Sequence, residues 1–320
     1  MLRYRGLDAV GISRTRSFEE VATWLWDAAW PATPPRWTGP PDASRVVSAT
    51  CAALDRRCPP ADRWRVAVAA AATADPLRHD HSPAAVTAAA GGLLASLVDI
   101  LPVVGQAVRR PAGTPTTLAG RLWPRLSPVT PTAAQVSALD AALVLMADHD
   151  LAASTLAARS AAAFGADPYA VVMTGMASAS GPYHAASSLQ VRPVLARAKQ
   201  HGPAVALGEV LSRGAGVHGF GQSLYPEGDP RAAELLARLR SFPSALDAVD
   251  GVLALAAGRG MPPPNRDFAL AALAEVTLMV PGASEAIFIL GRTAGWIAHA
   301  MEEYAERTSF RVRATYVGPR

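Results

Sequence analysis

The chain has 320 residues and a mass of 33.3 kDa, which is enough to bury a sizeable core. Half of its residues are hydrophobic and 18% are charged, so wholesale disorder is excluded. The 30 Lys and Arg residues nearly balance the 26 Asp and Glu residues, without a run of like charges, so we expect no nucleic-acid partner. The apolar residues are mostly Ala, Leu and Val, which favours helices.

The compartment is indicated by the cysteines and the hydropathy pattern. Two cysteines, Cys51 and Cys58, are too few for a disulfide scaffold or a zinc site, so we expect a reduced cytoplasm. The N-terminus lacks the apolar core of a signal peptide. The most apolar stretch, 83–108, is interrupted by Asp99 and Pro102, so we expect buried helices and no membrane span.

The first helix pattern runs from Ser17 to Trp30, where Ser17 and Glu20 form a predicted capping box. A proline-rich loop is expected over 31–41. The longest predicted helix is 132–164, with Asp148-His149-Asp150 in its interior, and Asp167-Pro168 should begin the next one. The pattern predicts an all-α protein, with further helices at 43–57, 61–74, 83–108, 168–179, 188–200, 203–212, 230–239, 243–257, 266–279 and 283–305.

Polar residues collect in four places where chemistry could occur: 147–150, 181–184, 214–222 and 262–267. In the first of them, a histidine stands between two acids that could orient it as a donor to an anionic ligand. The alternative is a core histidine whose hydrogen bonds are satisfied internally.

The glycine-rich segment 214–222 contains a formal G-x-G-x-x-G at Gly214, Gly216 and Gly219. A dinucleotide-binding fingerprint must follow a strand and open a helix, whereas the preceding residues look helical and the following ones read Pro-Glu-Gly-Asp. The segment is therefore interpreted as a tight loop whose backbone can approach a ligand closely, or as a purely structural turn.

Asp267 follows three prolines and Asn265, so its carboxylate should lie on a stiff backbone where a helix begins. Helix capping alone could explain this carboxylate. A rigid, partly desolvated carboxylate is also what a general base for a weak carbon acid requires.

Taken in chain order, these motifs resemble those of the citrate synthase family. The quoted segments are Leu2-Arg3-Tyr4-Arg5-Gly6, Ala147-Asp148-His149-Asp150 with Ala153-Ser154-Thr155, Gly181-Pro182-Tyr183-His184, Gly219-Phe220-Gly221-Gln222 with Asp229-Pro230-Arg231, Pro264-Asn265-Arg266-Asp267, and Phe288 with Arg292-Thr293-Ala294-Gly295-Trp296. Together, these ordered motifs at compatible spacings are a far stronger signal than any one of them.

The resemblance implies an all-α fold with a large domain, an inserted smaller domain and an active site in the cleft between them. Transferred to this chain, the large domain covers 1–183 and 273–320, and the small domain covers 184–272. The family's members are homodimers, so a homodimer is expected here. Closure of the two domains would exclude water from the substrates.

The reaction implied by the resemblance is a Claisen-type condensation of acetyl-CoA or propionyl-CoA with oxaloacetate or a related 2-oxo acid. By resemblance, Asp267 removes the α-proton and His184 stabilises the enol. The acyl-CoA is a substrate, and neither a metal nor a covalently bound cofactor is expected.

The resemblance also assigns the binding residues. The 2-oxo acid would be bound by side chains that include arginines, whose planar forks recognise carboxylates, and Arg311 would come from the second subunit. The expected substrate-binding residues are His149, Arg231, Arg292, Arg311, Asn265 and Phe288, and the expected CoA-binding residues are Val217, His218, Gly219, Phe220 and Gly221.

The largest departure from the family pattern is Gln222, which stands where the family has a histidine that polarises and protonates the oxo carbonyl. An amide can donate a hydrogen bond to an alkoxide but cannot transfer a proton near neutral pH. His218 is a candidate substitute, or simply an exposed loop residue. Besides an active synthase, the sequence therefore leaves open a relative with altered chemistry and a silent paralogue that binds CoA or regulates a partner.

Overall fold

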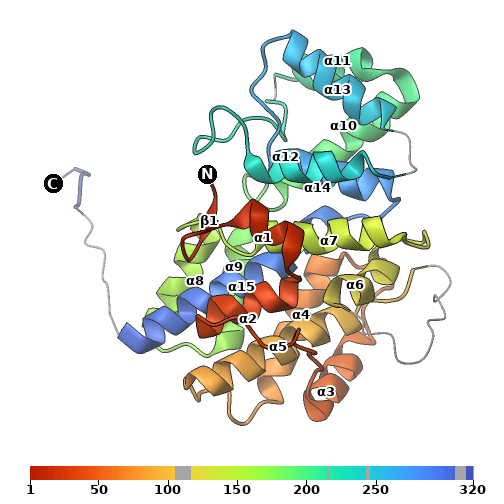
Figure 1. The fold of residues 1–320 in the computed structure, drawn as a ribbon. Coiled ribbons are helices and arrows are strands. Elements are labelled where there is room, and N and C mark those ends of the chain that lie inside the picture. The colour runs from red at the N-terminus through yellow and green to blue at the C-terminus, as the bar shows by residue number, and fades with distance from the viewer. Residues whose placement is uncertain (105–116, 215, 243–245, 307–314, 320) are drawn as a thin grey trace.

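The structure is a computed structural model that describes residues 1–104, 117–214, 216–242, 246–306 and 315–319. The described residues are almost entirely helical (Figure 1), with one two-stranded antiparallel ribbon near the N-terminus. The elements are β1 (Arg3–Tyr4), β2 (Leu7–Asp8), α1 (Ala9–Thr15), α2 (Phe18–Asp27), α3 (Pro41–Cys51), α4 (Pro60–Thr73), α5 (Pro83–Asp99), α6 (Leu118–Leu126), α7 (Ala133–Met146), α8 (Ala153–Ala163), α9 (Pro168–Ala179), α10 (Ser187–His201), α11 (Pro203–Ser212), α12 (Pro230–Leu239), α13 (Asp247–Gly258), α14 (Arg266–Val276) and α15 (Ala283–Glu306).

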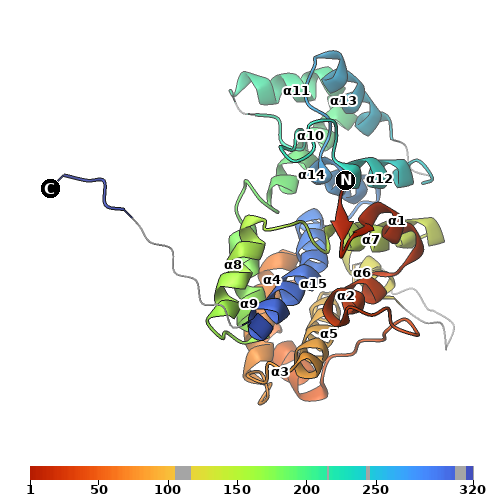
Figure 2. The same ribbon diagram turned by 60° about the vertical axis from the view of Figure 1, so that its left-hand side comes forward.

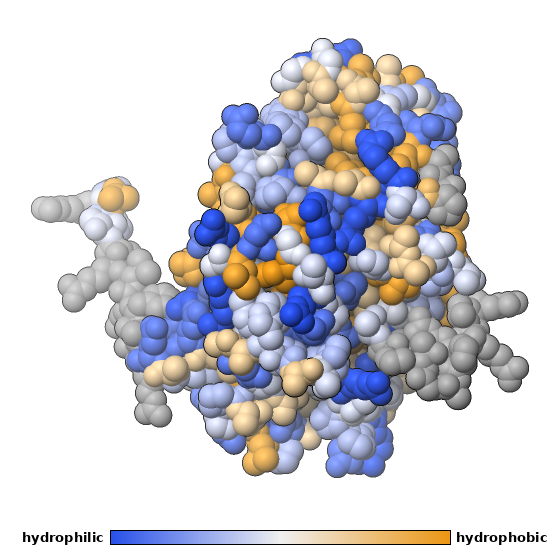
Figure 3. All heavy atoms as spheres, in the orientation of Figure 1, coloured by the Kyte–Doolittle hydropathy of each residue, from blue (hydrophilic) through white to orange (hydrophobic). Residues whose placement is uncertain are grey.

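The helices form two groups (Figures 1 and 2). One group contains α10 to α14, which pack against one another, and the other contains α1 to α9 together with α15. The long helix α15 is the centre of the second group, because it contacts α2, α4, α5, α7, α8 and α9. Trp64, Trp123 and Trp296 are fully buried in this core. On the face shown in Figure 3, hydrophilic and hydrophobic side chains are intermingled.

Several helix ends form as the sequence predicts. Ser17 and Glu20 make the reciprocal capping box at the start of α2. Asp167 caps α9, with Pro168 in its first turn. Two short helices, α1 and α6, were not predicted from the sequence, because a helix of seven to nine residues shows too few turns for a clear apolar period.

The single long helix predicted over 132–164 is wrong, because the chain forms two helices, α7 and α8, in its place. Between them Asp150 adopts a left-handed conformation with φ of 52°, which a right-handed helix cannot contain. Helix α15 crosses close to this break: a side-chain carbon added at Gly295 would lie 2.3 Å from the carbonyl oxygen of Ala147. The predicted helix over 83–108 ends at Asp99, and its residues 105–108 lie outside the described part of the chain.

Candidate active site

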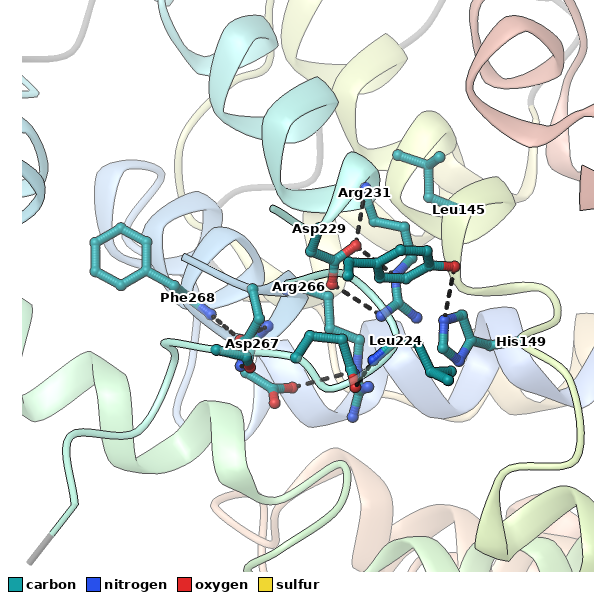
Figure 4. A network of polar contacts seen from close by, with 12 residues as sticks. Leu145, His149, Leu224, Asp229, Arg231, Arg266, Asp267 and Phe268 are labelled. Atoms are coloured by element: carbon teal, nitrogen blue, oxygen red, sulfur yellow. Dashed lines mark hydrogen bonds and ion pairs between the residues drawn. The ribbon is translucent and has the colours of Figure 1, made fainter. Parts of the chain in front are cut away.

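The break between α7 and α8 places His149 where the two helix groups meet. The His149 ring is 6% exposed, and its Nε2 atom lies 3.1 Å from the Tyr225 hydroxyl, which comes from the loop before α12 (Figure 4). Burial and the nearby guanidinium groups of Arg231, Arg292 and Arg266 lower the pKa of His149 to about 3. The imidazole is therefore neutral at physiological pH, so one of its ring nitrogens donates a hydrogen bond and the other accepts one.

A buried ion pair begins α12. Asp229 caps this helix, and its carboxylate binds the Arg231 guanidinium through two contacts, Nε to Oδ1 at 2.9 Å and Nη2 to Oδ2 at 2.8 Å. Both side chains have no exposed surface. Figure 4 shows the pair close to the start of α14, where Asp229 also accepts a hydrogen bond from the Arg266 backbone at 3.0 Å. The Nη1 atom of Arg231 is buried and lacks a hydrogen-bond partner.

A second buried arginine, Arg292, reaches the same region from α15. Its Nε atom donates to the carbonyl oxygen of Met146 at 2.8 Å, whereas its Nη2 atom is buried without a partner. Burial lowers the pKa of Arg292 to about 10, so the group remains a cation at neutral pH. Unpaired guanidinium nitrogens in one buried region are costly unless a ligand completes them. Carboxylates suit such forks well.

Phe288 lies between the arginines of α14 and α15. The guanidinium carbons of Arg266 and Arg292 are each 4.9 Å from its ring centroid, a distance at which cations interact favourably with an aromatic face. The His184 ring packs edge-on against the same phenyl ring at 5.4 Å. Phe288, itself part of the buried core, therefore packs against three polar side chains of this region.

The proline-rich segment before α14 is paired with the glycine loop. Gly221 donates a backbone hydrogen bond to Pro263, and Asn265 donates one to Gly219, each at 2.8 Å. The Asn265 side chain adds a bond to the carbonyl oxygen of Gly221 at 2.8 Å and also caps α14 by accepting from the backbone of Asp267 at 2.9 Å. The loop and the start of α14 are thus one rigid unit.

Asp267 lies in the first turn of α14 and is 6% exposed. Its Oδ1 atom has no hydrogen-bond partner, although Nε of Arg266 lies 3.4 Å away (Figure 4). Burial raises the pKa of Asp267, against the opposing influence of Arg266 and Arg231. Asp229 and Asp148 have lowered pKa values despite burial, because Arg231 and His299 respectively hydrogen-bond to them.

His184 follows α9, and its Nε2 atom lies 2.9 Å from the Ser154 hydroxyl of α8. Burial, together with the positive charges of Arg266 and Arg292, lowers the pKa of His184 to about 4. The ring is therefore neutral at pH 7. A neutral imidazole with one nitrogen fixed by Ser154 presents its other nitrogen as a directed hydrogen-bonding group.

Gln222 remains within its own loop. Its Oε1 atom accepts from the Ser223 hydroxyl at 3.4 Å and from the Leu224 backbone at 3.5 Å, which are long contacts. Tyr225, three residues later, is the loop side chain that reaches His149. The neighbouring CoA-loop candidates occupy a tight turn, in which Gly219 has φ of 91° and Gly221 has φ of 76°.

Of the residues predicted from the sequence, the structure gathers one cluster across the two helix groups, and Arg311 lies outside the described residues. Three residues that contact the cluster have no role predicted from the sequence: Tyr225, Ser154 and Arg266. Arg266 lies within a predicted motif, and Ser154 within another. The cluster itself contains His149, His184, Arg231, Asp267, Phe288 and Arg292.

Behind the cluster, His299 of α15 fixes the α7–α8 break. Its Nε2 atom lies 3.2 Å from Asp148 Oδ1, and its Nδ1 atom lies 3.3 Å from Glu302 Oε2 and 2.8 Å from Arg159 Nη1. Burial opposes the charged form of His299, but the carboxylates of Asp148 and Glu302 raise its pKa to about 9.

Because the folded pKa of about 9 exceeds the ordinary 6.5 of histidine, charged His299 stabilises the fold fully below pH 6.5, and this stabilisation is lost as the pH rises towards 9. We expect His299→Gln to lower the free energy of unfolding by up to about 3 kcal/mol at pH 6, and the deficit to shrink by pH 9.5. Urea unfolding across this range measures it. His201→Gln, at an exposed position, serves as control, and a deficit that does not change with pH would contradict the expectation.

No helix among the described residues is long and apolar enough to cross a membrane. Within the same residues, no group of three or more His, Cys, Asp or Glu side chains is arranged to hold a metal ion.

Among known protein families, the sequence model described as "Citrate synthase, C-terminal domain" matches residues 1–313 of this chain. A "Putative citrate synthase 2" of Mycobacterium tuberculosis (strain ATCC 25618 / H37Rv) is 33% identical over 198 residues, covering 59% of this chain and 53% of the relative. The chain thus spans about half the length of this relative. The "2-methylcitrate synthase 1" of Corynebacterium glutamicum is 25% identical over 342 residues, covering 99% of this chain and 89% of the relative.

Solved structures show the same fold. Citrate synthase from Thermotoga maritima MSB8 superposes with a TM-score of 0.77 at 20% identity, covering 99% of this chain and 89% of that one. Citrate synthase from Thermoplasma acidophilum, in its ternary complex with carboxymethyl coenzyme A and oxaloacetate, superposes with a TM-score of 0.75 at 20% identity, covering 99% and 90%. The predicted all-α, two-domain fold is confirmed. Because the family's sequence model spans nearly the whole chain, the protein belongs to the citrate synthase family.

Proposed function

We propose that the protein condenses a short acyl-CoA, acetyl-CoA or propionyl-CoA, with oxaloacetate to give citrate or 2-methylcitrate and free CoA, as an acyl-CoA C-acyltransferase. The observation that carries the proposal is the state of Asp267. It is the one carboxyl of Asp148, Asp229 and Asp267 whose pKa is raised, and its Oδ1 atom has no hydrogen-bond partner. Neighbouring carboxyls whose pKa values are pushed apart identify acid–base roles.

Two residues of the cluster then carry out the formation of the enol. Asp267 removes the α-proton of the acyl group, and His184 stabilises the enol by donating a hydrogen bond to the thioester oxygen. The lowered pKa of His184 keeps this donor neutral, and the contact with Ser154 orients the ring. A preorganised donor in a buried site stabilises developing charge more than it would in water.

The buried cations supply the anion site. Arg231 and Arg292 each have one unpartnered nitrogen, and these nitrogens, with His149, bind the two carboxylates of oxaloacetate. Phe288 separates Arg292 from Arg266 and shapes the wall of this site. A dicarboxylate therefore satisfies groups that are buried without partners in the free protein.

The glycine loop and the packing of the helices support the remaining roles. Residues Val217 to Gly221, braced by Asn265, bind the adenine end of CoA through backbone groups. Most of the helix group α10–α14 lies within the small domain expected over 184–272, which closes onto the large domain; the boundary at 272 falls inside α14. We place the reaction in a cytoplasmic homodimer, with Arg311 of one subunit completing the other's site and no metal required.

The test is thiol release by the purified full chain from acetyl-CoA and from propionyl-CoA, with and without oxaloacetate. We expect release that depends on oxaloacetate, and a product mass equal to citrate or 2-methylcitrate. Gln222→His should raise kcat at least about tenfold, because histidine can deliver a proton that an amide cannot. Silence of both proteins with both acyl-CoA substrates would overturn the proposed reaction.

A further inference from the structure

Two polar side chains, Ser187 and His218, lie between the buried Asp267 and the surface of the glycine loop. Burial raises the pKa of Asp267, and the nearby Ser187 hydroxyl, at the start of α10, opposes that rise. The same Ser187 hydroxyl lies 3.2 Å from Nδ1 of His218. The three residues belong to α14, α10 and the loop before α12, so the tertiary fold brings them together.

The position of His218 is fixed by its neighbour in the chain. Gly219 has φ of 91°, and a side-chain carbon there would lie 2.8 Å from Val191 and 3.1 Å from the Phe268 side chain. The loop backbone is therefore pressed against both α10 and α14, as only glycine allows. Asn265 holds the loop from the other side. His218 is consequently presented to Ser187 by a braced backbone.

Exposure increases along the three residues. Asp267 is 6% exposed and Ser187 is 8% exposed, whereas His218 is only partly buried. A serine hydroxyl can donate to one neighbour while accepting from another, and imidazole can accept at one nitrogen and release at the other. These are the properties of a route for a proton from a buried carboxyl to water.

We propose that Ser187 and His218 form a proton relay that returns Asp267 to its ionised state during the condensation; the inference rests on the function proposed above. The acyl C–H bond breaks, its electron pair stays in the enolate, and the proton binds Asp267. Asp267 passes this proton to the Ser187 oxygen while the Ser187 hydroxyl proton moves to Nδ1 of His218. His218 then releases a proton from Nε2 to water.

The relay also accounts for the proton that the product alkoxide needs and that Gln222 cannot supply. The new alkoxide must gain a proton, and the Gln222 amide cannot supply one. If water protonates the alkoxide, a hydroxide remains, and the proton released by His218 neutralises it. The side chains of Ser187 and His218 act through Asp267 and need no contact with either substrate.

The experiment compares native protein, Ser187→Ala, His218→Ala and His218→Gln, with His201→Ala as the matched control at an exposed position of α10. Turnover is measured by thiol release. Resetting of the base is measured separately, as exchange of the α-protons of acetyl-CoA in D2O with malate present, because malate has no ketone to react. Mass spectrometry of the recovered acetyl-CoA gives the exchange rate.

For His218→Ala and Ser187→Ala we expect kcat and exchange to fall at least about tenfold, with KM for acetyl-CoA little changed. Added imidazole should restore His218→Ala but not Ser187→Ala, and His201→Ala should behave as native. His218→Gln should stay slow, since an amide keeps the hydrogen bond but carries no proton.

Three results would overturn the relay. They are native rates in both alanine variants, full activity of His218→Gln, and failure of imidazole to restore His218→Ala. If the native chain turns over and Asp267→Asn does not, such a result removes the relay alone. If the native chain shows neither turnover nor exchange, the proposed condensation fails and the relay fails with it.

Discussion

Replacing Asp267 by asparagine is expected to lower kcat for thiol release by about a thousandfold, within the range that a positioned general base contributes. Asparagine keeps the shape of the side chain but cannot accept a proton. The folded protein should tolerate the change, because burial already raises the pKa of this carboxyl and therefore penalises its charge. Thiol release with saturating oxaloacetate measures kcat, and urea unfolding measures stability.

The matched control is Asp250→Asn. Asp250 lies on α13, and its carboxylate forms an exposed ion pair with Arg240. It should leave kcat unchanged, since exposed pairs contribute little. Binding of oxaloacetate to Asp267→Asn should also persist. An Asp267→Asn variant that retained more than about a tenth of native kcat would place the base elsewhere.

Sequence signals predict those elements around the site whose conformation is set by neighbouring residues in the chain. Asp167 before Pro168 predicted a helix start, and three prolines with Asn265 predicted a stiff approach to Asp267. The same kind of reasoning failed over 132–164. The apolar pattern of α7 and α8 reads as one helix, whereas the left-handed Asp150 and the close approach of Gly295 in α15 interrupt it. That approach involves residues nearly 150 positions apart.

The partners of the site residues were beyond the reach of sequence spacing for a similar reason. Ser154 contacts His184 across 30 positions, Tyr225 contacts His149 across 76, and Ser187 contacts His218 across 31. A serine or tyrosine has no local pattern that marks such a contact. The departure at Gln222, in contrast, was visible in the sequence, but its retention within its own loop required the structure.

The second large effect, on oxaloacetate binding, is expected at Arg292, whose buried Nη2 atom has no hydrogen-bond partner. Replacing Arg292 by methionine should weaken oxaloacetate binding by about 3 kcal/mol, or roughly a hundredfold in Kd, because a charge-assisted bond to a carboxylate is lost. The unliganded fold should change little in stability. The lost hydrogen bond to Met146 is offset by relief of a buried cation whose pKa is already lowered to about 10.

Thermal unfolding with and without oxaloacetate separates these two effects, since a ligand stabilises only the state that binds it. Native protein should show a clear rise in Tm, Arg292→Met almost none, and Arg240→Met, at an exposed pair, the native rise. An undiminished rise in Arg292→Met would place the dicarboxylate away from α15. A large fall in the Tm of unliganded Arg292→Met would instead show that this arginine holds the fold together, so that its unpaired nitrogen could no longer be attributed to an absent ligand.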